Sequence, residues 1–455
     1  MLRPVERPLP RFRRHLRGLS CLLLSAAALV GCVGRGAPAP PSPAATGPGP
    51  PSTLILISID GFRWDYLGLH PAPVLERLAA EGVRARALVP VFPTKTFPNH
   101  YTLVTGLYPE RHGIVSNTML DPEDGAWFRL SDREAVQSAR WWQGEPIWVT
   151  AERQGLRAAT LFWPGSEAPI GGVRPSRWLA YDEEMTPRAR VDRVLGWLDL
   201  PAASRPSLVT LYFEQVDDAG HDFGPRSPQT AAAVAAIDAE IGRLVHGLEM
   251  RGILDRVDLV LVSDHGMTEL AADRVVVLED LVDPDDVQAV AVSTFAMLRP
   301  RPGREQAVYE ALRAAPPQLQ IHRREEVPER LRYRDHRRIT PLVVLADEGW
   351  YLYTTHQQAR SRRLPAGMHG YDPELRSMHG LFVARGPSFR SGLVVDEVRS
   401  IDLYALMTAA LGLAPAPHQG DHARVAGLLA DHTSRPPPGF REVRARRSPT
   451  ARATP

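Results

Sequence analysis

The chain has 455 residues, 44% of them hydrophobic and 23% charged, so it is long enough for one large α/β domain or two smaller ones. The formal net charge is +2, but residues 1–31 and 434–455 each hold six Arg and one Glu, which leaves about −8 on residues 32–433. This balance argues against a surface for a long nucleic acid, which would need a basic face.

The first 31 residues are typical of a bacterial lipoprotein signal peptide. Arg3 to Arg17 form a basic segment, and Leu19 to Val30 form an apolar segment too short to cross a bilayer as a mature helix. The sequence Leu29-Val30-Gly31-Cys32 resembles a lipoprotein cleavage site and predicts a lipidated Cys32. The alternative is an ordinary secretory signal that ends near a cysteine. Because Cys21 leaves with the signal, no disulfide is expected within a mature chain.

Residues 33–52 are rich in Pro, Gly, Ala and Ser, which predicts a tether between Cys32 and a folded domain over residues 53–433. The expected location is the bacterial cell envelope, with the lipid as the only membrane anchor. Val33 after the cysteine favours the outer membrane, facing the periplasm or the surface. The basic tail, 434–455, is predicted to be disordered. The oligomeric state stays open.

Three apolar runs each lead to an aspartate. Short β-branched runs of this kind predict buried strands of a mainly parallel sheet. The runs and their aspartates are Leu54–Ile59 with Asp60, Ser207–Phe213 with Asp217, and Val257–Ser263 with Asp264. Ligands bind at the carboxyl edge of such sheets, so the three carboxylates are expected to meet there.

Helical patterns separate these strands and predict an α/β fold with helices flanking the central sheet. The helix candidates are Val74–Glu81, Pro187–Leu198, Thr230–Arg251, Ser400–Leu411 and Ala423–Leu429. Residues from about 280 to 365 hold no trusted ligand and are predicted to form an inserted α+β subdomain. Its expected elements are a strand at Val292–Leu298, a helix at Arg304–Ala314 and paired strands within Leu342–Tyr353.

Carboxylates and imidazoles without a thiolate suit two catalytic zinc ions better than a structural cysteine site. Asp60, Asp264 and His265 are predicted to hold one ion and to leave a position for the hydroxyl of Thr96. Asp217 and His221 are four residues apart and lie on one face of a helical turn. With His369 they are predicted to hold the second ion, next to a site for water. Asp218 is a local competitor of Asp217.

Two segments carry a family resemblance. Pro93-Thr94-Lys95-Thr96-Phe97-Pro98-Asn99-His100-Tyr101, followed by Thr105 to Ile114, resembles the nucleophile region of the nucleotide pyrophosphatase/phosphodiesterase family, within the alkaline phosphatase superfamily. The resemblance covers about residues 53–430 and implies an alkaline phosphatase-like catalytic domain. By position it implies Thr96 as the nucleophile and the two ligand sets given above. It also implies that Asn117 and the backbone N–H of Phe97 donate to a phosphate oxygen.

The resemblance also implies a substrate class. Phe97 follows the nucleophile, and Tyr181 matches an aromatic residue that stacks on a nucleobase, so both are predicted to bind a base. The alternative for Tyr181 is an ordinary loop aromatic. Lys95 is the only lysine of the chain and is expected to support the loop. His100, His112 and His379 exceed the ligand count and are expected to pack or to orient ligands.

The predicted activity is the hydrolysis of nucleotide phosphodiesters and pyrophosphates to nucleoside 5′-monophosphates through a covalent Thr96 intermediate. The partners are therefore small nucleotide diesters. One alternative keeps the metal core and acts on phospholipid-type diesters, phosphonates or phosphomonoesters. Another is a tethered lipoprotein that binds metal or nucleotide without catalysis.

Overall fold

The structure is a computed structural model, and residues 53–431 are described. The predicted signal peptide (1–31), the lipidated Cys32, the tether (33–52) and the basic tail (434–455) lie outside the described residues and remain predictions. Across 53–431, no helix has both the length and the apolar character that crossing a membrane requires.

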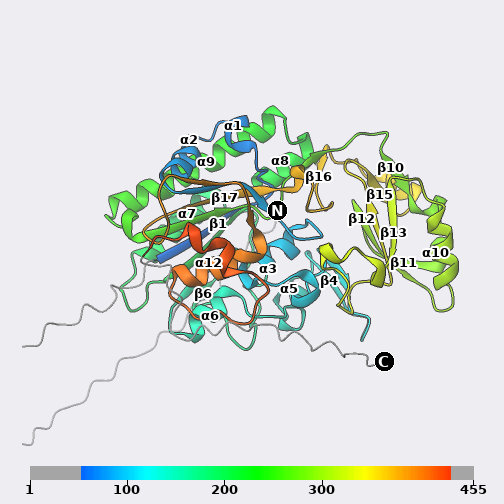
Figure 1. The fold of residues 1–455 in the computed structure, drawn as a ribbon, viewed down its shortest axis with the longest axis horizontal. Coiled ribbons are helices and arrows are strands. Elements are labelled where there is room, and N and C mark those ends of the chain that lie inside the picture. The colour runs from blue at the N-terminus through cyan, green and yellow to red at the C-terminus, as the bar shows by residue number, and fades with distance from the viewer. Residues whose placement is uncertain (1–52, 432–455) are drawn as a thin grey trace, which may run out of the picture. The chain divides into compact units, whose positions relative to one another are not determined.

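A nine-stranded sheet forms the centre of the domain (Figure 1). In spatial order its main path is β18 (Leu393–Val395), β2 (Val83–Val89), β17 (Gly380–Arg385), β8 (Val257–Val262), β1 (Thr53–Ile59), β7 (Leu208–Phe213), β5 (Ala158–Leu161) and β6 (Arg177–Trp178), with β19 (Val398–Arg399) beside β2. β17 runs antiparallel to β2 and β8. The other pairings in this sheet are parallel, so the predicted α/β fold with a mostly parallel sheet is confirmed.

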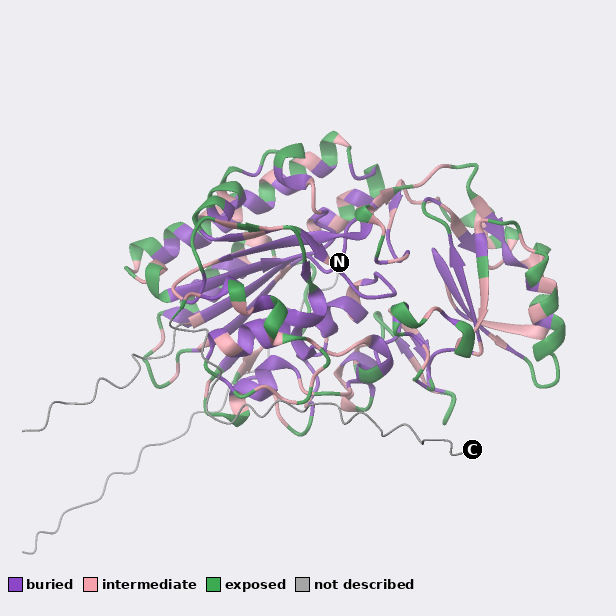
Figure 2. Ribbon diagram, in the orientation of Figure 1, coloured by how far each residue is buried: buried purple, intermediate pink, exposed green. Residues whose placement is uncertain are grey.

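Helices cover both faces of the sheet, so its strands are buried on both sides (Figure 2). Leu54 and Leu56 of β1 pack on the face covered by α3 (Thr96–Thr105), α6 (Ile147–Arg153) and α12 (Leu403–Ala410). Ile55, Ile57 and Ile59 pack on the opposite face, against α2 (Pro73–Glu81), α7 (Pro187–Leu198) and α9 (Pro228–Met250). Side chains alternate along a strand, which explains why an unbroken apolar run serves two cores.

The long helices begin where the sequence offers capping residues. The side chain of Thr186 accepts the N–H of Ala189 at the start of α7, and Ser227 does the same for Thr230 in α9. A proline occupies the first turn of both helices, where its missing N–H has no helical partner to lose. The observed bounds of α7 agree with the predicted helix Pro187–Leu198.

The carboxyl ends of three neighbouring strands lie at one edge of the sheet. β1 lies between β7 and β8 and is parallel to both. The chain therefore leaves all three strands in the same direction, into Asp60, into α8 (Gln215–Phe223) and into Asp264. This places the predicted ligand groups at the edge where ligands bind in such folds.

A separate four-stranded sheet occupies the chain between His265 and His369. Its order is β11 (Val287–Val292), β12 (Phe295–Pro300), β14 (Leu342–Ala346) and β13 (Leu319–Arg323), and α10 (Glu305–Arg313) packs on it. Two small sheets flank it in the chain, β10 (Val275–Val277) with β15 (Tyr351–Tyr353) and β9 (Thr268–Glu269) with β16 (Gly367–Met368). The hairpin β3 (Thr118–Leu120) and β4 (Trp127–Arg129) stands apart.

Several predicted elements differ in the structure. The single strand expected at Val292–Leu298 is wrong, because Ser293 and Thr294 form the turn between β11 and β12. The strands expected to pair within Leu342–Tyr353 pair with other partners, β14 with β12 and β13, and β15 with β10. The helix candidates at 400–411 and 423–429 each include a 3-10 turn. The strand partners depend on contacts between distant segments, which the periodicity of a single segment cannot show.

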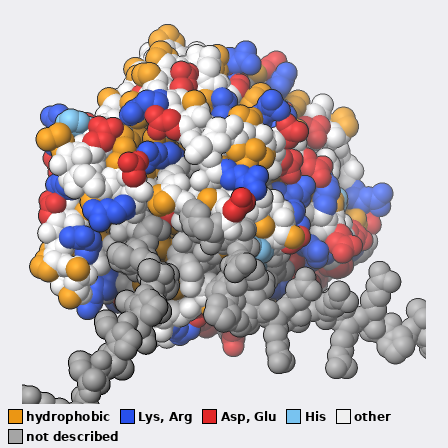
Figure 3. Space-filling view, turned by 60° about the vertical axis from the view of Figure 1, so that its left-hand side comes forward, with side chains coloured by type: hydrophobic (Ala, Val, Ile, Leu, Met, Phe, Trp, Pro, Cys, Tyr) orange, Lys and Arg blue, Asp and Glu red, His pale blue; other side chains and the backbone are white. Residues whose placement is uncertain are grey.

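The remaining helices are short. They are α1 (Tyr66–Leu69), α4 (Pro109–His112), α5 (Arg133–Gln137), α11 (His356–Ser361) and α13 (His422–Val425). On the face shown in Figure 3, basic and acidic side chains are interspersed over the described surface. Many of these charges form exposed pairs such as Arg243–Asp192 and Arg251–Asp199. Pairs of this kind contribute little to stability.

Candidate active site

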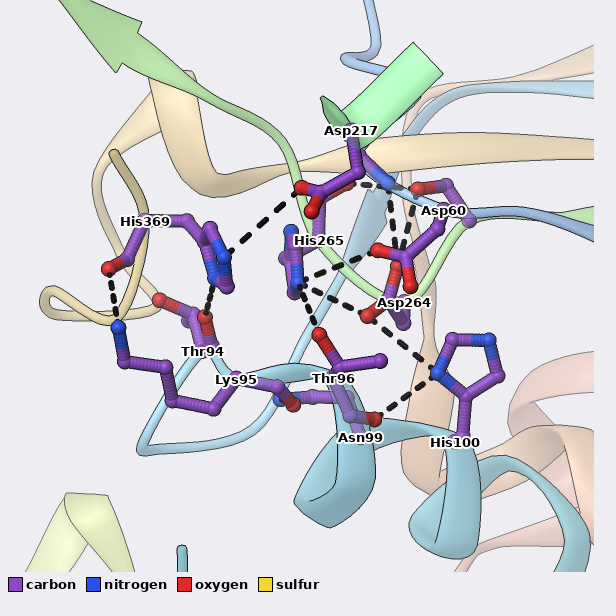
Figure 4. A network of polar contacts seen from close by, with 12 residues as sticks. Asp60, Thr94, Lys95, Thr96, Asn99, His100, Asp217, Asp264, His265 and His369 are labelled. Atoms are coloured by element: carbon purple, nitrogen blue, oxygen red, sulfur yellow. Dashed lines mark hydrogen bonds and ion pairs between the residues drawn. The ribbon is translucent and has the colours of Figure 1, made fainter. Parts of the chain in front are cut away.

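Three carboxylates that follow the three neighbouring strands, two directly and Asp217 on α8, meet at the sheet edge (Figure 4). Asp60 and Asp264 are each 1% exposed, and the Asp217 side chain is 13% exposed. The N–H of Gly61 donates to Asp264 Oδ1 at 3.3 Å, and the hydroxyl of Tyr212 donates to Asp60 Oδ2 at 2.7 Å. Gly61 has φ +66, and a Cβ there would lie 2.7 Å from Asp217 Oδ1, so only glycine lets the strands approach this closely.

Three imidazoles face these carboxylates, and each is held by a backbone carbonyl. The Nδ1–H of His221 donates to Gly367 O at 2.9 Å, that of His265 to Gly266 O at 3.0 Å, and that of His369 to Thr94 O at 2.7 Å. A ring nitrogen that faces a carbonyl must carry the proton, so Nε2 of each neutral ring presents a lone pair. All three rings therefore have the tautomer that a metal ligand needs.

The Nε2 atoms point at other lone pairs. His221 Nε2 lies 3.2 Å from His369 Nε2, and His265 Nε2 lies 2.9 Å from Asp264 Oδ2. His265 and His369 stack with ring centroids 3.5 Å apart. Among the described residues, Asp60 Oδ1, Asp217 Oδ1 and Asp264 Oδ2 form no hydrogen bond. Buried lone pairs that converge without donors are unfavourable unless cations lie among them, so the donor set fits metal ions.

The distances group these ligands into overlapping sets. Asp217, His221 and His369 lie within reach of one ion, as the sequence predicted. Asp60 shares a second set with His100 and Asp264, and a third with Asp217 and His265. The predicted trio Asp60, Asp264 and His265 is close together, since His265 Nε2 contacts a carboxylate oxygen of both aspartates at 3.5 and 2.9 Å.

His100 differs from the three candidate ligands. Its Nδ1–H donates to Thr96 O at 2.9 Å, and its Nε2 accepts the hydroxyl of Ser58 at 2.8 Å. Both ring nitrogens therefore have protein partners, while Nδ1 also lies 3.3 Å from Asp264 Oδ2. These contacts fit a residue that orients Asp264 and the start of α3, in line with the supporting role expected from the sequence.

The close approach of the three carboxylates affects the pKa of Asp60. Burial, followed by the negative charges of Asp264 and Asp217, raises the pKa of Asp60 well above its ordinary value. The carboxylate form of this residue therefore needs a positive charge nearby. Asp218 is exposed at the surface, but partial desolvation together with the negative charges of Asp217 and Glu214 raises its pKa to about 6. Both aspartates line the neighbouring cavity, but only Asp217 belongs to the ligand cluster, which separates the two competitors.

Thr96 is the first residue of α3, and its Oγ1 lies 3.5 Å from His265 Nε2. The threonine thus lies beside the ligand cluster, half-buried and at the positive end of a ten-residue helix. Asn117 lies next to it, but the expected pair of donors is arranged differently. The N–H of Phe97 donates to Asn117 Oδ1 at 3.0 Å, so in this state the two groups bind each other. Because Asn117 Oδ1 accepts this hydrogen bond, the Nδ2 hydrogens of Asn117 point to the other side of the amide.

A cavity of about 420 Å³ adjoins Thr96 and the carboxylates. The two aromatic residues predicted to bind a base, Phe97 and Tyr181, both line it, and Tyr181 is 37% exposed. Phe162 packs edge-on against Tyr181 with ring centroids 5.3 Å apart. The cavity volume suits a small organic ligand rather than a polymer.

Several residues of the cavity wall were not predicted from the sequence, and Tyr212 and Leu130 are two of them. Tyr212 holds Asp60 and also lines the cavity, and Leu130 is an unusually exposed leucine on the cavity wall. Tyr212 points out of β7 next to the catalytic edge, and its position five residues before Asp217 was the available signal. Leu130 follows β4 and carries no such signal in the sequence.

Comparisons with known proteins agree with this geometry. The family model described as type I phosphodiesterase/nucleotide pyrophosphatase matches residues 54–372. Human ectonucleotide pyrophosphatase/phosphodiesterase family member 5 is 37% identical over 377 residues, which cover 83% of this chain and 78% of that protein. Bovine bis(5′-adenosyl)-triphosphatase ENPP4 is 36% identical over 417 residues, which cover 91% and 87% of the two chains.

Solved structures give the same result. Murine ectonucleotide pyrophosphatase/phosphodiesterase 5, in an inactive threonine-to-alanine form in complex with AMP, superposes with a TM-score of 0.80 at 37% identity. The match covers 84% of this chain and 100% of that chain. The fold, the converging aspartates and histidines, and these relatives lead to one conclusion. The chain belongs to the family of type I phosphodiesterases and nucleotide pyrophosphatases, which hydrolyse phosphodiesters.

Proposed function

We propose that this protein is a two-zinc hydrolase that releases nucleoside 5′-monophosphates from nucleotide diesters and pyrophosphates. The observation that carries the proposal is the set of three imidazoles whose Nδ1 atoms are held by carbonyls and whose Nε2 atoms converge on carboxylates beside Thr96. The AMP bound to the murine relative supports the nucleotide class, because AMP is a nucleoside 5′-monophosphate.

The proposed nucleophile is the hydroxyl of Thr96. As it loses its proton, its oxygen forms a bond to phosphorus while the leaving-group oxygen departs with its electron pair. Water then attacks the phosphorus of the nucleotidyl-threonine, breaks the bond to Thr96, restores the hydroxyl and releases the nucleoside 5′-monophosphate. The inactivity of a threonine-to-alanine variant of the murine relative supports a threonine in this role. Asn117 is proposed to donate its Nδ2 hydrogens to the phosphate, with Phe97 N–H as its partner once the substrate displaces their mutual bond.

The proposed ligands form two sets. Asp60, Asp264 and His265 hold the ion next to Thr96, and Asp217, His221 and His369 hold the ion next to the attacking water. Bound zinc would lower the pKa of a neighbouring hydroxyl or water and neutralise negative charge on the phosphate oxygens. The tautomers described above leave the required lone pairs free.

The cavity wall favours a diester over a monoester. Glu183 and Asp218 line the cavity with Thr96, as does Glu214, which is paired with Arg190. Arg133, the one arginine among the described residues that line it, is paired with Glu167. A phosphomonoester carries one more negative charge than a diester and would meet these carboxylates without a free guanidinium from the cavity wall. Phe97 and Tyr181 line the same cavity and are proposed to contact an aromatic base there.

Removal of one ligand tests the metal centre. We expect Asp217→Asn to reduce the zinc content from two ions per chain towards one and to lower the diesterase rate by about 100-fold or more, because one ligand set loses a charged oxygen. Asp218→Asn is the matched control, since it neutralises the adjacent carboxylate outside the cluster, and it should keep both ions. The zinc content is measured by elemental analysis after dialysis. Equal zinc contents of the two variants would contradict the assignment.

Removal of the hydroxyl tests the covalent scheme. Thr96→Ala should lower kcat for p-nitrophenyl thymidine 5′-monophosphate by on the order of 10³-fold or more while the zinc content stays at the wild-type value. Thr96→Ser keeps a hydroxyl and should retain much of the activity. Turnover by the alanine variant near the wild-type rate would show that Thr96 is not the nucleophile.

Truncation of Tyr181 tests the base-binding cavity. A stacked base contributes about 1–3 kcal/mol, so Tyr181→Ala should lower kcat/KM for the thymidine diester by about 5- to 150-fold. Tyr181→Phe preserves the ring and should cost little. The comparison substrate is methyl p-nitrophenyl phosphate, which has no base and should be affected far less. Equal losses on both diesters would argue for a different substrate class.

We also propose that the mature protein is a lipoprotein anchored through Cys32 in the bacterial cell envelope. The apolar segment that ends in Leu29-Val30-Gly31-Cys32 supports this. The mass of the mature N-terminal peptide is expected to show a diacylated or triacylated cysteine. An unmodified N-terminus at another position would indicate an ordinary secretory signal instead.

A further inference from the structure

The turn between β11 and β12 connects the inserted sheet to a candidate metal ligand. Thr294 lies in this turn with 0% exposure, and its hydroxyl donates to the carbonyl oxygen of His369 at 2.9 Å. The turn is itself tied to the subdomain, because Ala346 N–H donates to Thr294 O and Leu352 N–H donates to Ser293 O. The inserted sheet, none of whose strands carries a predicted ligand, thus binds the backbone of His369 directly.

The same carbonyl has a second donor from the opposite direction. Lys95 Nζ, on the residue before Thr96, donates to His369 O at 3.0 Å, and the lysine is 6% exposed (Figure 4). Thr94 completes the arrangement, since its carbonyl accepts His369 Nδ1–H and its hydroxyl accepts the N–H of Gly370. We call Thr94, Lys95 and Thr294 the His369 clamp.

The donors of the clamp pack closely against Gly370. Gly370 has φ +110, and a Cβ on it would lie 2.4 Å from both Lys95 Cε and Thr294 Oγ1. Only a glycine therefore lets the two donors reach the neighbouring carbonyl. Buried groups packed at contact distance cannot shift independently, so a movement of the turn would move the loop that carries His369.

We propose that Thr294 is a positioning residue, through which the inserted subdomain, together with Lys95, fixes His369 as a metal ligand. The ring bond to Thr94 O sets the tautomer but leaves the position of the loop to the carbonyl contacts. Outer partners that orient a metal ligand affect metal affinity by about 10- to 100-fold when they are removed. The inference depends on the metal centre of the proposed function.

The test is zinc affinity in the full chain, measured by competition with a chromogenic chelator. Thr294→Val keeps the shape of the side chain and removes the hydroxyl, and it should weaken the more weakly held zinc by about tenfold or more. Thr294→Ser keeps the hydroxyl and should restore affinity. Lys95→Met removes the other donor and should act in the same direction.

Thr340→Val is the matched control. Thr340 is also 0% exposed, and its hydroxyl donates to Leu342 O at 2.8 Å within the subdomain, away from His369. It should reduce the melting temperature as Thr294→Val does, without a change in zinc affinity. Equal zinc affinities of Thr294→Val, Thr340→Val and the wild type would overturn the inference alone. A wild-type protein without zinc binding would overturn the proposed metal centre as well.

A second readout does not involve metal or activity. Lys95 is the only lysine of the chain, so lysine-selective ¹³C labelling gives one lysine side-chain Cε signal in an NMR spectrum. Thr294→Val should shift this signal, because the two donors share one acceptor and touch the same glycine. Thr340→Val should leave it in place. A signal that is unchanged in Thr294→Val would show that the clamp does not couple the two segments.

Discussion

The repulsion among buried carboxylates and imidazole lone pairs at the carboxyl edge of the sheet is the constraint on which the site depends. Parallel pairing of β7, β1 and β8 brings Asp217, Asp60 and Asp264 together, whatever their charges. The Nδ1–H groups of His221, His265 and His369 are each used by a carbonyl, so these rings in their neutral form turn lone pairs, not protons, towards the cluster. This arrangement needs positive charge among the carboxylates, which metal ions would supply, and this is why the geometry indicates metal ions.

Backbone carbonyls do most of the orienting in this protein. Gly367, Gly266 and Thr94 each determine a tautomer through one carbonyl oxygen, and the His369 carbonyl connects the loop before Thr96 to the inserted sheet. The pairing of β9 with β16 contributes as well, because it places the segment before His369 beside the segment after His265. The inserted sheet therefore has a structural reason to lie between these two ligands in the chain.

Some elements predicted from the sequence agree with the structure, and others do not. Strands that end in Asp60, Asp217 and Asp264 were predictable, because an apolar β-branched run followed by a carboxylate is a local pattern. The turn at Thr294 was predicted to be the middle of a strand, since a short polar interruption between two apolar stretches does not show where a hairpin turns. Tyr212 and Leu130 were missed because both line the cavity together with Tyr181. Residues that line a cavity come from separate segments of the chain, so they leave no periodic pattern in the sequence.

The sequence by itself determined the chemistry, namely which oxygen and nitrogen donors exist, that thiolates play no part, and that one threonine sits among family-like motifs beside the only lysine. It also determined the α/β class, because strand and helix periods are local properties. The tertiary structure alone decided that Asp217 rather than Asp218 joins the cluster, that Thr96 O and Ser58 are the partners of His100, and that Thr294 reaches His369. These outcomes depend on distances of a few ångströms between residues far apart in the chain, and such distances follow only from the packing of the whole domain.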